Sequence, residues 1–140
     1  MPGAASAWSL PRPGEIQDGA RLRRVRLGWR ARYVLEAGRA VSGAWLESLG
    51  RLPFDEARRA IREIPGVGDK VGDCILLFAL GFGEAFPVDV WIRRAMRRAY
   101  PRLRRAGDRA IADLAAARFG PRAGLAQQYL YVLARDLRLP

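Results

Sequence analysis

One lysine stands alone among the 25 basic residues of this 140-residue chain, because the other 24 are all arginine. It is Lys70, and it ends the segment Ile64-Pro65-Gly66-Val67-Gly68-Asp69-Lys70. A guanidinium group keeps its proton in proteins, whereas a lysine amine can become neutral, attack carbon and form a Schiff base. The alternative is that one lysine simply survived an arginine-rich composition. The surrounding residues favour Lys70 as a nucleophile.

A carboxylate follows this lysine at a distance that suits a shared cleft. Asp89 lies nineteen residues after Lys70, in Phe86-Pro87-Val88-Asp89-Val90-Trp91, where a helix is expected to begin. Asp89 could simply cap that helix by accepting the backbone N–H of Trp91 or Ile92. The two roles are compatible, because a cap holds the carboxylate in one place. One helix and a loop can return the chain so that Lys70 and Asp89 flank one cleft.

The turn before Lys70 has the composition of a phosphate-binding hairpin. Pro65 ends the preceding helix, and Gly66 and Gly68 permit positive φ and the close approach of another backbone. The next helix then presents unpaired N–H groups and the positive end of its dipole. These features predict a helix-hairpin-helix that grips a DNA backbone through Gly66, Val67 and Gly68. The alternative is a tight pair of helices that binds no ligand.

The overall charge favours a polyanionic partner. Lys and Arg number 25 against 14 Asp and Glu, which gives a formal net charge of +11 without any histidine. Nucleic acid ranks ahead of an anionic membrane surface, and a solvated arginine-rich surface without a partner is the alternative. The single cysteine and the lack of histidine exclude a disulfide framework, a four-Cys metal or iron–sulfur site, and a Ser-His or Cys-His dyad. We therefore expect no metal site and no required cofactor.

The sequence also bounds the location of the protein. No apolar run approaches the roughly 18 residues of a transmembrane helix, and Met1–Gly14 lacks the features of a signal peptide. We expect a soluble, intracellular protein, in the cytoplasm at the nucleoid of a bacterium and without a membrane partner. The arginine excess is typical of a GC-rich genome. The oligomeric state is left open.

Helical periodicity between Gly and Pro residues predicts an all-α fold, a compact orthogonal bundle. The predicted helices span residues 19–26, 28–41, 43–49, 53–63, 70–80, 90–100, 108–119 and 121–137. The helix at 70–80 is apolar almost all round, so we expect it to be the central buried helix. Residues 1–18 are expected to be poorly ordered, and residues 19–140 to form one domain.

Two of the later helices carry informative faces. The helix at 90–100 has a basic flank, formed by Arg93, Arg94, Arg97 and Arg98. In the last helix an apolar stripe is expected from Leu130, Leu133 and Leu137. Gln127 and Tyr131 share another face, and Tyr129 is expected in the core.

Several of these segments together resemble one protein family. Gly66-Val67-Gly68-Asp69-Lys70-Val71 followed by Pro87-Val88-Asp89-Val90 resembles the helix-hairpin-helix–Gly/Pro–Asp (HhH-GPD) superfamily of DNA glycosylases. Within it, the chain is most similar to the 8-oxoguanine DNA glycosylase/AP lyases. Three segments support that choice: Leu27-Gly28-Trp29-Arg30-Ala31-Arg32-Tyr33-Val34, Lys70-Val71-Gly72-Asp73-Cys74 and Gly120-Pro121-Arg122-Ala123-Gly124-Leu125-Ala126-Gln127. The resemblance extends from about Leu22 to Leu137. The chain lacks the four-Cys iron–sulfur loop that many endonuclease III-like enzymes contain.

The resemblance implies base-excision repair of damaged double-stranded DNA. Lys70 would attack C1′ of an 8-oxoguanine nucleotide, expel the base and form a Schiff base, after which β-elimination would cut the strand. Asp89 would stabilise the oxocarbenium-like charge that develops on the sugar. An apolar cleft around Lys70 and the N-terminus of its helix would favour the neutral amine.

The resemblance also implies a pocket for a flipped base. Cys74, four residues after Lys70, would pack on the base, although a lone cysteine is more often core filler. Gln127 would read a base edge and Tyr131 would stack on the purine. Trp91, Arg93 and Arg94 would contact DNA, with packing in the core or exposure to solvent as the alternatives. A monovalent cation is expected at the hairpin carbonyls.

The 8-oxoguanine enzymes usually carry a β-rich domain and further helices before the segment that matches Leu27–Val34. We therefore expect this chain to lack that N-terminal part, and with it most of the residues that select the lesion. Two alternatives remain open. One is a non-catalytic or truncated helix-hairpin-helix module that binds DNA. The other is an AP lyase, or an endonuclease III-like enzyme, with another lesion preference.

Overall fold

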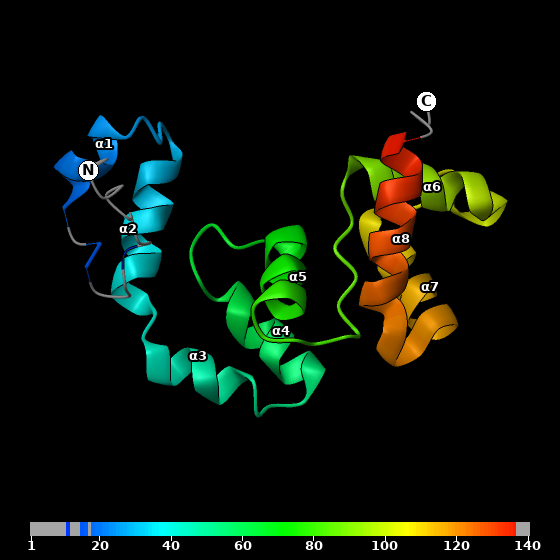
Figure 1. The fold of residues 1–140 in the computed structure, drawn as a ribbon, viewed down its shortest axis with the longest axis horizontal. Helices are drawn as coiled ribbons and strands as arrows, with labels where there is room; N and C mark the ends of the chain where they lie inside the picture. The colour runs from blue at the N-terminus through cyan, green and yellow to red at the C-terminus, as the bar shows by residue number, and fades with distance from the viewer. Residues whose placement is uncertain (1–10, 12–14, 17, 137–140) are drawn as a thin grey trace, which may run out of the picture. The chain divides into compact units, whose positions relative to one another are not determined.

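The computed structural model describes residues 11, 15–16 and 18–136, which form helices joined by turns without any β-strand among them. The chain divides into two units, Met1–Glu47 and Ser48–Pro140 (Figure 1). The all-α prediction is confirmed. The boundary expected at residue 18 stays a prediction, and most of the segment before it lies outside the described residues.

The first unit contains two helices that pack on each other, α1 (Gly19–Arg24) and α2 (Arg30–Ala40). Positive φ angles of 55° at Arg26 and 56° at Gly28 turn the chain between them, so both helices are shorter than predicted. At the start of α2, the rings of Trp29 and Tyr33 meet edge to face with their centroids 6.0 Å apart. The next helix, α3 (Gly43–Leu49), crosses the division between the units.

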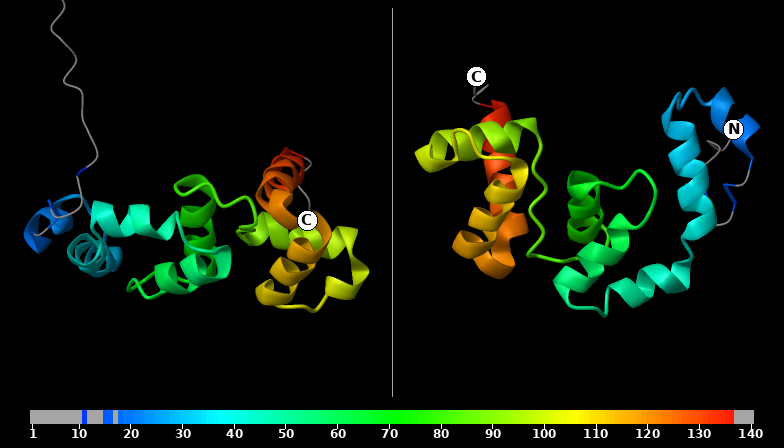
Figure 2. Two further views of the ribbon diagram at one scale, coloured as in Figure 1. Left: turned by 90° about the horizontal axis from the view of Figure 1, so that it is seen from below. Right: turned by 180° about the vertical axis from the view of Figure 1, so that it is seen from behind.

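The second unit begins with a pair of helices joined by the hairpin, α4 (Phe54–Arg62) and α5 (Asp69–Phe78). The helices α4 and α5 pack side by side, as the views in Figures 1 and 2 show. Residues 85–89, which have no regular secondary structure, then lead to α6 (Val90–Ala99). The chain continues through η1 (Pro101–Leu103), α7 (Asp108–Phe119), η2 (Gly120–Arg122) and α8 (Ala123–Asp136). The helices α6, α7 and α8 pack together.

Every predicted helix is present with its ends displaced by at most two residues over the described range. The expected burial, however, is wrong for two of them. α5 buries only Gly72, Asp73 and Leu76, while its Phe78 is 63% exposed, so it is not buried all round. On α8, Tyr129 is 72% exposed rather than in the core, and Leu133 is exposed as well. Leu130 does pack on the core, and Leu137 lies outside the described residues.

A core of apolar side chains holds the turn that precedes α6. Its buried members are Phe86, Val88, Ile92, Met96, Leu103, Ile111, Ala115 and Ala123. The rings of Phe86 and Phe119 stack with their centroids 6.3 Å apart. Because Phe86 and Val88 are both buried, the backbone that carries Asp89 is anchored on the core.

Two glycines allow the start of α8 to approach the loop after α5. The Gly124 N–H donates to the Gly83 carbonyl at 2.7 Å. A Cβ atom on Gly83 would lie 2.4 Å from the carbonyl oxygen of Pro121, which is less than a normal contact and involves backbone on both sides. This contact connects α5 to α8 on the side where both helices carry predicted site residues.

We expect Gly83→Ala to lower the free energy of unfolding by about 1–3 kcal/mol, because one backbone must move to relieve the overlap. Chemical denaturation followed by circular dichroism measures this. Gly43→Ala is the matched control, since nothing lies within 4 Å of a Cβ there. Equal stability of both variants would mean that the close approach is absent in solution.

Candidate active site

The residues predicted to act on a nucleotide meet at one pocket of the second unit. It has a volume of about 200 Å³ and is lined by Lys70, Cys74, Phe78, Pro87, Asp89, Gln127, Gln128 and Tyr131. All five predicted catalytic and base-pocket residues are in this set. They come from α5, from the turn before α6 and from α8, so it is the folding of the second unit that brings them together.

Lys70 lies in the first turn of α5 and is exposed, so the expected burial in an apolar cleft is wrong. The exposed hairpin residues Pro65, Gly66 and Gly68 precede it and leave its side open to solvent. A second, polar pocket of about 70 Å³ also reaches Lys70 and is lined by Arg58, Asp69, Asp73, Val88, Asp108, Arg109 and Ala112 as well. Lys70 therefore lines both a pocket of mixed polar and apolar character and a charged pocket.

Asp89 occupies the N-cap of α6, and its Oδ1 accepts the Ile92 N–H at 2.8 Å. The predicted capping is thus confirmed, with Ile92 as the donor. Asp89 is half-buried and lines the same pocket as Lys70. The cap and the buried neighbours Phe86 and Val88 fix the carboxylate in position before any ligand arrives.

The α8 wall of the pocket is built around a buried amide. Gln127 is 5% exposed, and its Nε2 donates to the Pro87 carbonyl at 3.1 Å. Its Oε1 accepts a hydrogen bond from Gln128. Tyr131 is half-buried, with the Arg135 guanidinium 5.9 Å from the centre of its ring. The amide is thereby oriented, with one N–H of Nε2 committed to the chain itself.

Three pocket residues were not singled out from the sequence, namely Phe78, Pro87 and Gln128. Phe78 follows the half-buried free cysteine Cys74 by four residues and Lys70 by eight, so all three share one face of α5. That spacing was available in the sequence. The expectation that the helix at 70–80 is buried all round instead implies a core position for Phe78.

The hairpin has the predicted turn with one difference. Gly66 has a positive φ of 84°, whereas Gly68 has φ −93° and ψ −175° and does not use the positive φ that glycine permits. Gly68 is the N-cap of α5, and an N-cap residue ordinarily has extended backbone. No side chain caps this helix. Its first N–H groups therefore have no side-chain acceptor, which leaves them available to an anion.

Three of the four arginines of α6 contact other groups of the chain. Arg93 donates two hydrogen bonds to Asp108, at 2.6 and 2.7 Å, which hold the pKa of Asp108 below its ordinary range. Arg97 donates to the Ala106 carbonyl at 2.6 Å. The Arg94 guanidinium lies 5.4 Å from the centre of the half-buried Trp91 ring. This flank ties α6 to the start of α7, and its contact with DNA stays a prediction.

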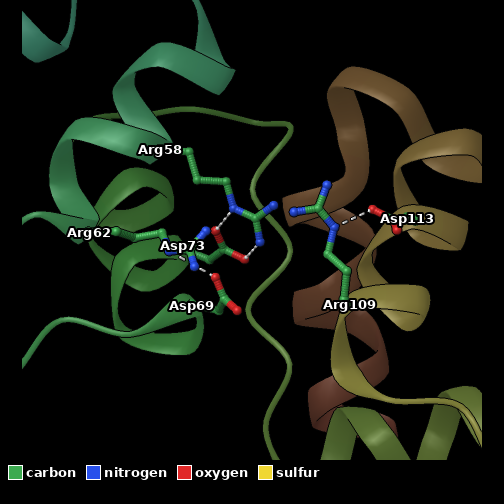
Figure 3. A network of polar contacts seen from close by, with 6 residues as sticks. All are labelled: Arg58, Arg62, Asp69, Asp73, Arg109 and Asp113. Carbon is green, nitrogen blue, oxygen red and sulfur yellow. Dashed lines mark hydrogen bonds and ion pairs between the residues drawn. The ribbon is translucent and has the colours of Figure 1, made fainter.

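A buried ion pair ties α4 to α5 beside the site (Figure 3). Arg58 donates to both carboxylate oxygens of Asp73, at 2.7 and 2.9 Å. The two side chains are 12% and 4% exposed. Burial raises the pKa of Asp73, and the hydrogen bonds from Arg58 oppose that rise. Asp73 lies one turn after Lys70 on α5, so the pair anchors the helix that carries the amine.

Within the described part of the chain, no cluster of three or more His, Cys, Asp or Glu side chains is placed to hold a metal ion. The cation expected at the hairpin carbonyls stays a prediction. Among the same residues, no helix combines the length and the apolar character needed to cross a membrane.

The curated proteins that are similar to this chain in sequence include N-glycosylase/DNA lyases. A probable N-glycosylase/DNA lyase of Methanothermobacter thermautotrophicus is 40% identical over 128 residues, which cover 91% of this chain and 40% of the relative. An N-glycosylase/DNA lyase of Arabidopsis thaliana is 37% identical over 91 residues, which cover 59% of this chain and 25% of the relative. No family model matches the chain.

The fold gives the same result. The 8-oxoguanine glycosylase/lyase of Clostridium acetobutylicum, solved with duplex DNA that contains cytosine opposite 8-oxoguanine, superposes with a TM-score of 0.85 at 29% identity. The match covers 94% of this chain and 46% of that one, so the chain spans less than half the length of each of these relatives. Over the length that it spans, the chain is similar in sequence to N-glycosylase/DNA lyases and in fold to an 8-oxoguanine glycosylase/lyase.

Proposed function

We propose that this protein removes 8-oxoguanine from duplex DNA and then cuts the strand at the resulting abasic site. The observation that carries the proposal is the single pocket that joins Lys70 and Asp89 with Cys74, Gln127 and Tyr131. An amine, a carboxylate, an aromatic ring and an amide around one space are the groups that base excision through a Schiff base needs.

Lys70 is the proposed nucleophile. Its neutral amine attacks C1′, and the bond from C1′ to the base nitrogen breaks, with the electron pair leaving on the base, which takes up a proton. The sugar ring opens to give a protonated Schiff base on Lys70. Loss of a proton from C2′ then expels the 3′ phosphate. The exposed amine and the open helix N-terminus allow a DNA strand to reach this position.

Asp89 is proposed to stabilise the positive charge that develops on the sugar as the base departs. A carboxylate already fixed by the Ile92 N–H need not reorganise during the reaction. The hairpin would hold the neighbouring phosphates through the backbone N–H groups of Gly66 and Gly68, since the Val67 N–H already donates to the Ile64 carbonyl at 3.0 Å. A monovalent cation on the hairpin carbonyls belongs to the same proposal, as does an intracellular location beside the DNA.

The second candidate is a helix-hairpin-helix module that binds DNA without cleaving it. The exposure of Lys70 favours this candidate, because an exposed ammonium group beside a hairpin can serve as a phosphate contact alone. A third candidate is a lyase that cuts at abasic sites and has another lesion preference. It would share the Schiff-base step with the proposed enzyme but would not remove 8-oxoguanine.

Trapping with sodium borohydride separates these functions, because borohydride reduces a Schiff base to a stable amine. The proposed enzyme gives a covalent adduct on both 8-oxoguanine duplex and abasic duplex. An adduct on abasic duplex alone would establish a lyase without glycosylase activity on this lesion. Binding to both duplexes without any adduct would refute the enzyme and leave the binding module.

Asp89→Asn is expected to slow adduct formation on 8-oxoguanine duplex by about a hundredfold or more. Asparagine is as good an N-cap as aspartate, so the variant keeps the bond to Ile92 and loses only the charge. Quenched-flow trapping measures the rate, and a thermal melt verifies the fold. Asp69→Asn is the control, since Asp69 is an exposed acid next to Lys70 and pairs with Arg62 at 3.1 Å. If both variants slowed adduct formation equally, Asp89 would contribute only as one more negative charge near Lys70 and would have no specific role at the sugar.

A further inference from the structure

Gln128 is a polar residue of the pocket that the proposed reaction does not use. It lies on α8 beside Gln127 and lines the pocket of Lys70 and Asp89 from the same wall. Its side chain is half-buried, and its Nε2 donates a hydrogen bond to the Oε1 of Gln127. The wall therefore carries two coupled amides, and their combined hydrogen-bonding pattern is what a base would meet.

The direction of both amides follows from one fixed acceptor. A carbonyl oxygen only accepts, so the group that faces the Pro87 carbonyl at 3.1 Å is the Nε2 of Gln127. The Pro87 side chain is fully buried, which holds this carbonyl in place. The Oε1 of Gln127 then faces Gln128 and requires a donor there. Gln128 consequently turns its Nε2 toward Gln127, and its own Oε1 is left without a hydrogen-bond partner among the described residues.

The two amides present their remaining hydrogen-bonding groups in a fixed order. From the Pro87 side, these are the second N–H of Gln127, the second lone pair of its Oε1, and the Oε1 of Gln128. The order is donor, acceptor, acceptor. The Watson–Crick edge of a guanine-type base has O6, N1–H and the 2-amino group, which are acceptor, donor and donor. An adenine-type edge has the 6-amino group and N1, which set a donor against the donor and an acceptor against the acceptor.

We propose that Gln128 is a specificity-determining residue of this pocket and selects oxidised purines with a guanine-type edge over those with an adenine-type edge. It fixes the direction of the Gln127 amide and supplies the acceptor for the 2-amino group. The inference rests on the proposed function, in which a flipped base enters this pocket. The wrong base is rejected because the amides lose water on its entry without gaining partners.

Equilibrium binding by the Lys70→Arg chain tests this inference without requiring turnover. Two duplexes are compared, one with 8-oxoguanine and one with 8-oxoadenine, which share the oxidised C8 and differ in the Watson–Crick edge. With Gln128 intact, we expect binding of the 8-oxoguanine duplex to be about tenfold tighter. The absence of any preference would overturn the inference.

Two substitutions separate the donor of Gln128 from its acceptor. Gln128→Glu has nearly the same size but only accepts, so it repels the Oε1 of Gln127, and the preference should disappear. Gln128→Arg only donates, so it keeps the direction of Gln127 and loses one acceptor, and a preference of about threefold should remain. A preference that survives in Gln128→Glu, or that is lost equally in both variants, would overturn the role of hydrogen-bond direction.

The matched control for the added charge is Tyr129→Glu. Tyr129 is the next residue of α8, is 72% exposed, and lines an open hollow on the outer side of the helix instead of the pocket. This variant should weaken binding of both duplexes equally and leave their ratio unchanged. Borohydride trapping on the wild type reports separately on the proposed function. A wild type without any adduct would refute the enzyme, while the ratio of affinities would still decide for or against Gln128.

NMR spectroscopy observes the amides directly, because the chain contains three glutamines, at positions 17, 127 and 128, and no asparagine. Gln17→Ala and Gln128→Arg identify two of the side-chain NH₂ signals, so the third belongs to Gln127. In the protein without DNA, the Gln127 protons should exchange with water more slowly than those of a glutamine in a short peptide. Their signals should shift in Gln128→Glu. Exchange as fast as in the peptide would overturn the fixed wall.

Discussion

Lys70→Arg is expected to abolish covalent trapping on 8-oxoguanine and abasic duplexes, with a rate loss of at least about a thousandfold. Arginine keeps the positive charge beside the hairpin, so DNA affinity should change little. It cannot form a Schiff base, because its guanidinium does not become a neutral amine. Trapping yield and a binding isotherm on the same duplex provide the two measurements. A comparable loss of affinity would indicate that Lys70 acts as a phosphate contact.

The composition of the chain makes this test unusually clean, because Lys70 is its only lysine. The double variant Lys70→Arg/Arg59→Lys returns an amine to the surface at an exposed position outside the pocket. It should not restore trapping, because an amine alone is insufficient without the pocket. Peptide mapping of the wild-type adduct should place the DNA on Lys70 and not on the amino terminus. An adduct that persists in the single variant would refute Lys70 as the nucleophile.

Arg58→Met is expected to lower the free energy of unfolding at neutral pH by about 3–5 kcal/mol. Methionine keeps the apolar stem of the side chain but leaves the Asp73 carboxylate, 4% exposed, without its partner. Removing one member of a buried pair leaves an uncompensated charge in a medium that solvates it poorly. Urea denaturation measures the change. The surface pair Arg109–Asp113 on α7 is the control, with side chains 67% and 58% exposed (Figure 3). Arg109→Met should cost no more than about 1 kcal/mol.

The effect of Arg58→Met should depend on pH in a defined direction. Burial raises the pKa of Asp73 above its ordinary value of 3.8, so the folded state holds this proton more tightly than the unfolded chain does. The contribution of Asp73 to stability therefore grows as pH falls through the raised pKa and is complete below the ordinary value. In Arg58→Met the hydrogen bonds that lower the pKa of Asp73 are absent, so the pKa of Asp73 rises further. The loss in free energy of unfolding caused by Arg58→Met should therefore be smaller at pH 4 than at pH 7. A loss that grows on acidification would contradict this explanation.

The helices were predictable from the sequence because glycine and proline mark their ends. Pro65 and Gly66 separate α4 from α5, and Gly107 and Gly120 flank α7, where the predicted bounds match the observed ones. At Gly68 the sequence does not decide the backbone angle, since a glycine permits positive φ without requiring it. The conformation there is set by the start of α5, which needs an extended residue.

The site was predictable where the spacing of residues limits the geometry. Lys70 and Cys74 share a helix face, and Asp89 begins a helix, so their positions follow from local rules. Burial was less predictable. Periodicity identifies an apolar face but not what covers it, so Tyr129 and Phe78 were placed in the core although both are exposed. Arg58 shows the reverse, because its charged side chain is largely buried where it pairs with Asp73 on the neighbouring helix.

The bond from Gln127 to the Pro87 carbonyl has a thermodynamic consequence for ligand binding. A free glutamine side chain samples many rotamers, and freezing it on binding opposes association by roughly 0.5–1.5 kcal/mol. In this protein the freezing takes place during folding, since the amide is held at both ends before a ligand is present. A base entering the pocket would meet a donor that is already immobile. The selectivity of this wall would then come from which base edges fit a fixed amide, with little room for the amide to adapt to them.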